Sequence, residues 1–273
     1  MALVVDEPAF SRPPATDEPL PAQRSPLLLE LGIVVCLVWI YDWLQNLAPL
    51  RKGLALHHAT LVLSFEQHYG IALERSLDHW LMAHPSLAGI ASNFYDNAIF
   101  AVTLGLVAVT WWRRPDLYRP LRNYLVLANL IGFAVFWAYP LAPPRMLAGF
   151  YDVVEKYPGI GGWHNELISH ADQLAAMPSM HLAWAVWCSI VVWRLWGRGR
   201  ARWLIAFLAV LYPASTAWVV MATANHFLLD VLAGAATTGV SVLAVELGLP
   251  LLRQVPVVEA YQRSWTRGRT TSS

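Results

Sequence analysis

Long apolar runs separated by short polar segments make up most of the chain. A helix needs about 20 mainly apolar residues to cross roughly 30 Å of hydrocarbon, and it satisfies its own backbone polar groups. The runs therefore predict an all-α fold, a polytopic membrane bundle of six transmembrane spans. These spans cover residues 27–48, 90–112, 121–140, 179–197, 203–222 and 227–249.

Two segments between the spans have different patterns. Residues 53–86 mix polar and apolar residues at roughly helical spacing. This pattern predicts an amphipathic helical hairpin after the first span, lying on the membrane surface or capping the bundle. Residues 141–172 contain several prolines and glycines and are too broken to span a membrane. We expect a long loop there, and long loops in compact proteins are often functional.

The two ends of the chain are polar. Residues 1–26 place prolines among acidic and small residues, a composition typical of disordered segments. The sequence therefore predicts a disordered cytoplasmic tail over 1–26, a six-span membrane domain over 27–252 and a second cytoplasmic tail over 253–273.

Composition and charge support the membrane assignment. The chain is 57% hydrophobic and 14% charged, whereas soluble domains are about 25% charged. The net charge of +1 is too small to indicate a nucleic-acid partner. With the N-terminus inside, 14 of the 19 Lys and Arg residues fall in inner segments. This asymmetry predicts that both termini are cytoplasmic.

Four ionisable side chains fall at the outer ends of three predicted spans. Arg145 follows the third span, His181 lies in the first turn of the fourth, and His226 and Asp230 lie in the first turns of the sixth. Titratable groups at membrane depth are costly and indicate a functional role. Three helices are therefore expected to bring a cation, two imidazoles and a carboxylate to one depth.

The spacing of these residues indicates a reaction type. His226 and Asp230 are four residues apart, so one helix face lets the carboxylate accept a hydrogen bond from the imidazole. Ser179, beside Pro178 at the first position of the fourth span, lies where amide groups can bind an anion. Arg145 adds a planar fork that matches phosphate oxygens. One histidine can then attack phosphorus while the other protonates the leaving oxygen.

The motifs that carry these residues resemble those of the type 2 phosphatidic acid phosphatase superfamily, which read Pro-Ser-x-His and His-x-x-x-Asp. Here they are residues 178–181 and 226–230. Met180 replaces the usual glycine, and valines at 219 and 220 replace a usual Ser-Arg pair. With the stretch PLAPPR at 140–145, the chain is more similar to the inositol-phosphorylceramide-synthase-like branch, whose inositolphosphotransferases move a phosphoinositol head group onto a lipid alcohol.

The resemblance implies roles for the motif residues. His226 would be the nucleophile that forms a phosphohistidine, Asp230 would orient it, and His181 would be first the acid and then the base. Arg145 and Ser179 would bind the phosphate.

Further substrate-binding residues are implied around the motifs. The missing third-motif arginine leaves a second phosphate ligand open, for which Lys156, Arg75 and backbone amides near the second motif are candidates. Other donors that flank the motifs are Tyr139, Gln173 and Asn225. No metal or other cofactor is expected, because protein groups supply the positive charge and the sequence has no HExxH motif or Cys/His cluster.

The implied protein is an integral-membrane lipid phosphotransferase with its active site at the outer face of the plasma membrane. It would move a phosphorylated head group, such as phosphoinositol, to a lipid or polyol alcohol. With water as acceptor it would be a lipid phosphate phosphatase. A non-catalytic lipid-binding or transport protein on the same fold is the third interpretation. The expected partners are membrane lipids, a phospholipid substrate and an alcohol or water acceptor; the sequence does not predict an oligomeric state.

Overall fold

The computed structural model describes residues 24–47, 51–159 and 174–253. Within these ranges the regular elements are helices, apart from one bridge between Leu141 and Ala175. The all-α prediction is confirmed for this part of the chain. The predicted tails fall mostly on residues 1–23 and 254–273, outside the described residues. In chain order the elements are α1 (Leu27–Leu47), α2 (Lys52–His68), α3 (Glu74–Met82), α4 (Pro85–Arg113), α5 (Pro115–Ala138), the 3-10 turn η2 (Pro144–Met146), α6 (Val153–Lys156), α7 (Met180–Trp196), α8 (Arg202–Ala222) and α9 (Leu228–Arg253).

The predicted spans all coincide with helices. Four of them are long and apolar enough to cross a membrane, namely α4, α5, α8 and the Leu228–Gly248 part of α9. Helix α7 is apolar but has 17 residues, at the short end of the range for a span. The chain is therefore an integral membrane protein, while the number of six spans remains a prediction.

Two prolines fix the starts of α4 and α5. Pro85 and Pro115 each occupy the beginning of a helix, where the missing amide costs nothing and the ring already has helical φ. Arg114, just before Pro115, has φ −137° and ψ 63°, so α4 ends there. Both helices begin before the predicted spans because they continue into polar flanking residues that hydropathy alone does not include.

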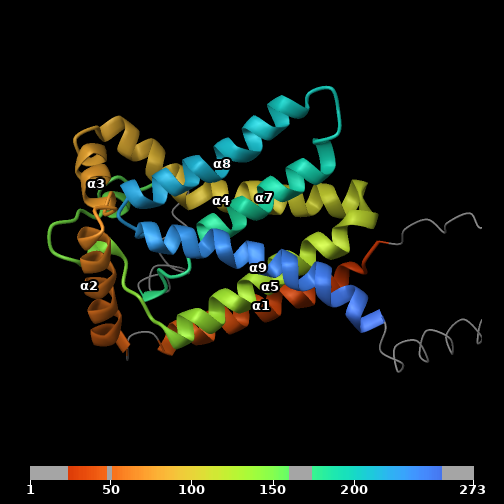
Figure 1. Ribbon diagram of the computed structural model, residues 1–273, viewed down its shortest axis with the longest axis horizontal. Coiled ribbons are helices and arrows are strands. Elements are labelled where there is room, and N and C mark those ends of the chain that lie inside the picture. The colour runs from red at the N-terminus through yellow and green to blue at the C-terminus, as the bar shows by residue number, and fades with distance from the viewer. Residues whose placement is uncertain (1–23, 48–50, 160–173, 254–273) are drawn as a thin grey trace, which may run out of the picture.

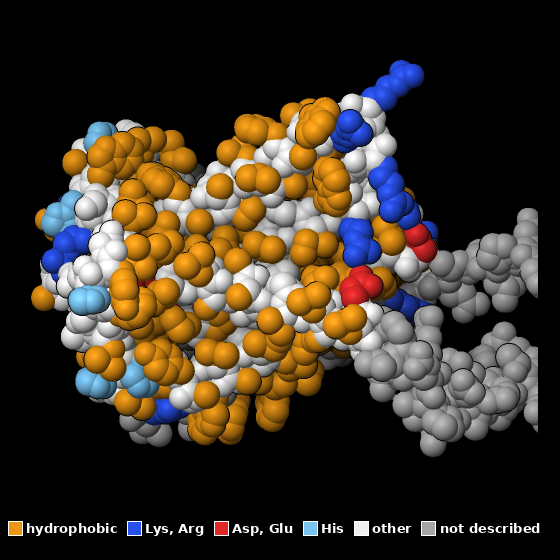
Figure 2. Space-filling view, viewed as in Figure 1, with side chains coloured by type: hydrophobic (Ala, Val, Ile, Leu, Met, Phe, Trp, Pro, Cys, Tyr) orange, Lys and Arg blue, Asp and Glu red, His pale blue; other side chains and the backbone are white. Residues whose placement is uncertain are grey.

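The long helices run side by side along the long axis of the molecule, and α2 and α3 lie across one end (Figure 1). Apolar side chains cover the flank of the bundle in Figure 2, and most of the visible Lys and Arg side chains gather at the end far from α2 and α3. Exposed Leu and Trp side chains occur along the helices, with Leu28 84% and Trp203 75% exposed. Such a continuous apolar surface fits contact with lipid.

Two helices occupy the segment for which a hairpin is predicted. Figure 1 shows α2 and α3 following one another across the end of the bundle. Helix α2 packs on α9, whereas α3 packs on α4, α6 and α8. The segment thus forms two successive helices with different partners, and its amphipathic surface role remains a prediction.

Helix α7 lies among α4, α5, α8 and α9, and it packs closely because small residues face it. A Cβ atom on Gly132 of α5 would lie 2.6 Å from the sulfur of Met180. On the other side, Gly234 of α9 lies against the carbonyl group of Ser179. Small residues let helix backbones approach in this way in membranes. The beginning of α7 is therefore fixed against both α5 and α9.

Candidate active site

Three loop segments meet where α7 and α9 begin. The amide of Arg145 donates to the carbonyl oxygen of Ala224 at 2.8 Å, and the amide of Ser179 donates to that of Asp230 at 3.0 Å. The amide of Ala176 donates to the carbonyl oxygen of Leu141, also at 3.0 Å. Backbone hydrogen bonds therefore join the three motifs, which lie far apart in the sequence.

The two motif histidines face each other. The centroids of the His181 and His226 rings are 5.9 Å apart, with an angle of 60° between the rings. His181 also stacks on Tyr95 of α4, with ring centroids 4.3 Å apart. The two rings therefore lie next to each other where α7 and α9 begin.

A backbone carbonyl orients the His226 ring. Nδ1 of His226 lies 2.9 Å from the carbonyl oxygen of Ala176 and 3.5 Å from Oδ2 of Asp230. A carbonyl oxygen can only accept, so Nδ1 carries the proton and the lone pair of the neutral ring is on Nε2. The ring is 5% exposed, so burial preserves this arrangement.

The structure changes the predicted relation between His226 and Asp230. His226 lies in the loop before α9, which begins at Leu228. The two residues do not share a helix face, and the shorter Nδ1 contact is with Ala176. Asp230 instead accepts a hydrogen bond from the amide of Phe227 at 2.9 Å. The Ala176 carbonyl is a contributor that the sequence could not reveal, because every residue has a carbonyl group.

Arg145 is held by two side chains. Its Nε lies 3.2 Å from Oδ2 of Asp152, and its Nη1 donates to Oδ1 of Asn225. Asn225 in turn donates to Oγ1 of Thr223 at 2.9 Å. Arg145 and Asn225, which were predicted separately as substrate ligands, are therefore in contact, and Asp152, which the sequence did not single out, also binds the guanidinium group.

Ser179 connects α7 to α9. It is the N-cap of α7, so Pro178 lies before the helix and does not occupy its predicted first position. The Ser179 hydroxyl accepts a hydrogen bond from the amide of Leu182 at 3.4 Å, while the Ser179 amide is bonded to Asp230. Met180 begins α7 and fills the space beside Gly132. Its sulfur thus has a packing role at the position where the related phosphatases have glycine.

The position of the missing arginine lies in the protein core. Val220 is fully buried, and its carbonyl oxygen accepts hydrogen bonds from the amides of Asn225 at 3.0 Å and His226 at 3.1 Å. Val219 lines an apolar cavity. This part of α8 therefore supports the loop before α9 through its backbone.

Tyr139 and Lys156, two other predicted substrate ligands, contact residues outside the three motifs. Tyr139 follows α5 and stacks on His58 of α2, with ring centroids 4.0 Å apart. Lys156 is exposed, and its ammonium nitrogen lies 5.6 Å from the centre of the Tyr157 ring. Gln173 lies outside the described residues. Among the residues that are described, no group of three or more His, Cys, Asp or Glu side chains could hold a metal ion.

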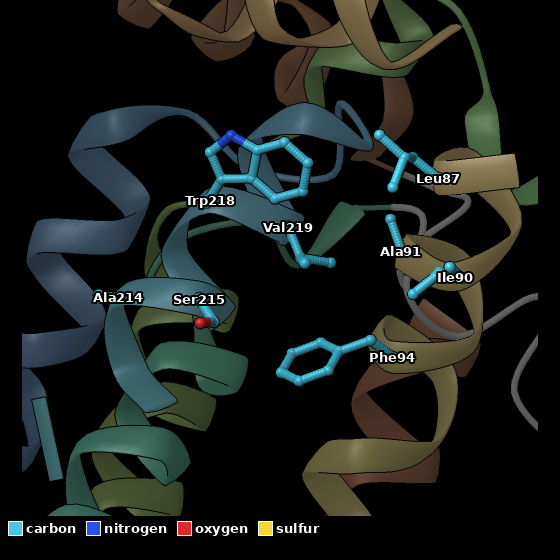
Figure 3. A pocket seen from close by; sticks show the side chains of 8 residues that line it. All are labelled: Leu87, Ile90, Ala91, Phe94, Ala214, Ser215, Trp218 and Val219. Atoms are coloured by element: carbon cyan, nitrogen blue, oxygen red, sulfur yellow. The ribbon is translucent and has the colours of Figure 1, made fainter. Parts of the chain in front are cut away.

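An apolar cavity of about 520 Å³ lies between α4 and α8. Figure 3 shows Leu87, Ile90 and Phe94 on one side and Trp218 and Val219 on the other. Ala91, which also lines the cavity, is one helical turn from Tyr95, the residue that stacks on His181. The cavity and the stacking contact with His181 therefore involve residues of α4 that are one helical turn apart.

The fold and this site define a class: an integral membrane helical protein in which two histidines, an arginine and an aspartate come together near the point where two packed helices begin. The family model of the PAP2 superfamily matches residues 60–244, more than half of the chain, and the chain belongs to this superfamily. This confirms the superfamily that the motifs indicated.

A curated relative supports the inositolphosphotransferase-like branch. The chain is 26% identical to the phosphoinositol dihydroceramide synthase of Bacteroides thetaiotaomicron over 183 residues, which cover 57% of this chain and 59% of that protein. The chain thus aligns with less than two thirds of that relative's length. No solved structure gives a significant match.

Proposed function

We propose that this protein is a lipid phosphotransferase that moves a phosphorylated head group from a phospholipid to an alcohol through a phosphohistidine. The observation that carries the proposal is the pair of facing imidazoles, 5.9 Å apart, with Nδ1 of His226 hydrogen-bonded to a carbonyl oxygen. This arrangement directs the nucleophilic lone pair of Nε2 away from Ala176. The proposed catalytic residues are His181, His226 and Asp230.

In the first step, Nε2 of His226 attacks phosphorus, the new bond joins nitrogen to phosphorus, and the bond to the leaving oxygen breaks. Protonated His181 gives its proton to that oxygen. In the second step, neutral His181 takes a proton from the acceptor hydroxyl, whose oxygen attacks phosphorus and releases His226. Asp230, 3.5 Å from Nδ1, stabilises the positive charge of the phosphorylated ring.

The charges around the site favour a phosphodiester substrate. Arg145 shares its charge with Asp152 at 3.2 Å, and the usual position of a second arginine is the buried Val220. A phosphate monoester carries about −1.5 to −2 charges near pH 7, whereas a diester carries one. A head group joined through a diester, such as phosphoinositol, therefore suits this site better than a terminal phosphate. The name of the Bacteroides relative supports the same head group.

The acyl chain and the head group of the proposed substrate also have suitable neighbours. An acyl chain fits the apolar cavity between α4 and α8, which adjoins His181 through Tyr95. Tyr139, Ser179, Asn225 and, in the segment outside the described residues, Gln173 remain proposed ligands around the head group, with Lys156 at the rim.

The proposed setting is a six-span catalytic domain over residues 27–252 in the plasma membrane. The Lys and Arg side chains at the end far from α2 and α3 (Figure 2) support a cytoplasmic location for that end. The histidine pair, at the end with α2 and α3, would then face outward, and both termini would be cytoplasmic.

The test uses the full chain in detergent or vesicles with phosphatidylinositol labelled with ³²P. A transferase moves the label to a second lipid when dihydroceramide or another lipid alcohol is added. Transfer to water instead releases the label as water-soluble inositol phosphate whatever alcohol is offered, which would overturn the transferase assignment. Phosphatidic acid, a monoester, should be a poorer substrate than the diester.

Two variants test the covalent step. His226→Ala should abolish conversion and remove the acid-labile label that denaturation traps on the protein. The control is His57→Ala, because His57 is exposed on α2. Full lipid conversion by the His226 variant would refute the mechanism, and no conversion by the unaltered chain would favour a non-catalytic protein.

A further inference from the structure

Two glutamates outside the three motifs bind the first amides of α9. Oε1 of Glu66, near the end of α2, accepts a hydrogen bond from the amide of Leu229 at 2.8 Å. Oε1 of Glu74, the first residue of α3, accepts one from the amide of Leu228, also at 2.8 Å. Both glutamates are fully buried. The two amides lie in the chain between His226 and Asp230.

These contacts replace a local helix cap. The first amides of a helix have no partner within the helix and are usually capped by a neighbouring Ser, Thr, Asp or Asn. Phe227 stands just before α9 and has no side-chain acceptor. Asp230 bonds the amide of Phe227 at 2.9 Å. Three successive amides therefore donate hydrogen bonds to carboxyl groups of Asp230 in α9, Glu74 in α3 and Glu66 in α2.

The Glu66 carboxyl group holds its proton more tightly than an exposed glutamate does. Burial and a hydrogen bond with the Glu74 carboxyl raise the pKa of Glu66 to about 9. Oε1 of each glutamate faces the first amides of α9, where the positive end of the helix favours an acceptor.

We propose that Glu66 and Glu74 are positioning residues that fix the start of α9, and with it His226 and Asp230, opposite His181. The proposal rests on the proposed function, because it assigns these glutamates to the same histidine pair. It makes α2 and α3 part of the catalytic unit.

The placement of the contacts explains why positioning is needed. The loop that carries His226 is bound to α8 through the Val220 carbonyl and to the segment before α7 through Ala176. The glutamates hold the other side of this loop, where α9 begins. Loss of one contact lets the imidazole move relative to His181, and a displacement of about 1 Å lowers turnover by roughly 100-fold.

The chemistry of Glu66 predicts different results for its amide and alanine variants. In Glu66→Gln, the amide oxygen can still accept from Leu229 and the NH₂ group can donate to Glu74. In Glu66→Ala and Glu74→Ala, an acceptor for the first amides of α9 is lost. Glu66→Gln should therefore keep the turnover that Glu66→Ala loses.

The experiment measures turnover, KM and the single-turnover rate of protein labelling with ³²P-phosphatidylinositol. Glu66→Ala and Glu74→Ala should lower turnover and labelling rate by about 100-fold, with KM changed less than threefold. Glu66→Gln should stay within about fivefold of the unaltered chain. Glu155→Gln is the control, because Glu155 is exposed on α6.

Each outcome decides the proposal. Equal and full turnover in all glutamate variants would overturn it, while an inactive His226→Ala variant would leave the proposed function standing. Equal losses in Glu66→Gln and Glu66→Ala would reduce the pair to a structural role and would also overturn it. If Glu74→Ala does not fold, Glu74→Asp shortens the side chain and withdraws the acceptor from the amide of Leu228. That variant should lower turnover at unchanged KM, and full turnover would count against the proposal.

Discussion

Replacement of Gly234 by alanine is a sharp test of how the site is held together. A Cβ atom at position 234 would lie 2.2 Å from the carbonyl oxygen of Ser179 and 3.1 Å from its carbonyl carbon. Cβ atoms in proteins essentially never lie closer than 3.0 Å to another heavy atom, so the Ser179 carbonyl must retreat by about 1 Å. Neither atom is the end of a flexible side chain, and the backbone itself must move.

The displacement reaches both histidines. The Ser179 carbonyl accepts from the amide of Ala183 at 3.0 Å, so the first turn of α7, which carries His181, moves with it. The Ser179 amide is bonded to Asp230, which lies beside His226. Overpacking costs typically about 1–3 kcal/mol, and alanine in a helix returns up to about 1 kcal/mol. We therefore expect a folded protein, destabilised by about 1–2 kcal/mol, with turnover lowered by roughly 100-fold.

The assay compares lipid conversion and thermal unfolding in detergent for Gly234→Ala and Gly239→Ala. Gly239 lies on the same helix, is exposed, and has no heavy atom within 4 Å of an added Cβ. The control should keep full turnover and equal or greater stability. A folded Gly234→Ala protein with turnover within threefold of the unaltered chain would show that the contact between Ser179 and α9 does not position the histidines.

Three further variants test other parts of the molecule. Arg145→Lys cannot keep both side-chain contacts of the guanidinium, so kcat/KM for the diester should fall more than tenfold; an unchanged value would exclude Arg145 from phosphate binding. Trp187→Phe removes a buried hydrogen bond of 2.7 Å to α5. The free energy of unfolding, measured by denaturation in detergent, should fall by about 1–3 kcal/mol, while turnover stays the same. Burial, with Glu74 and Asp230 nearby, raises the pKa of Glu66 to about 9. The unaltered chain should therefore lose stability as pH rises from about 4.5 to 9, whereas Glu66→Gln should lose less. Parallel pH dependences of thermal unfolding in the two proteins would contradict the raised pKa of Glu66.

Hydropathy and motif spacing predicted the helices and the meeting of the motifs. Each apolar run became a helix, because in lipid the backbone has no other partner for its polar groups. His181 begins one of these helices and His226 lies just before another, and the predicted alternation of span direction put both residues at one end of the bundle. The predicted bounds differed most at α4 and α5, where Pro85 and Pro115 start the helices in polar sequence.

The contacts that orient the site could not be predicted in the same way. Glu66 and Glu74 bond backbone amides that are 163 and 154 residues away in the sequence. The Ala176 carbonyl, which orients His226, has no side-chain signal either. An amphipathic pattern also predicts helices over 53–86 without specifying what each helix packs against. The observed site therefore differs from the predicted one mainly in its long-range contacts to backbone atoms.

These backbone contacts explain how short motifs can specify a whole active site. Ser179 binds Asp230 through main-chain atoms, Val220 binds the loop of His226 through its carbonyl, and neither bond depends on the side chain. Specific residues are required only where space or charge matters, as at Gly234 and at the buried glutamates. Few positions therefore need a particular side chain for the three motifs to meet, which fits the 26% identity between this chain and the Bacteroides synthase.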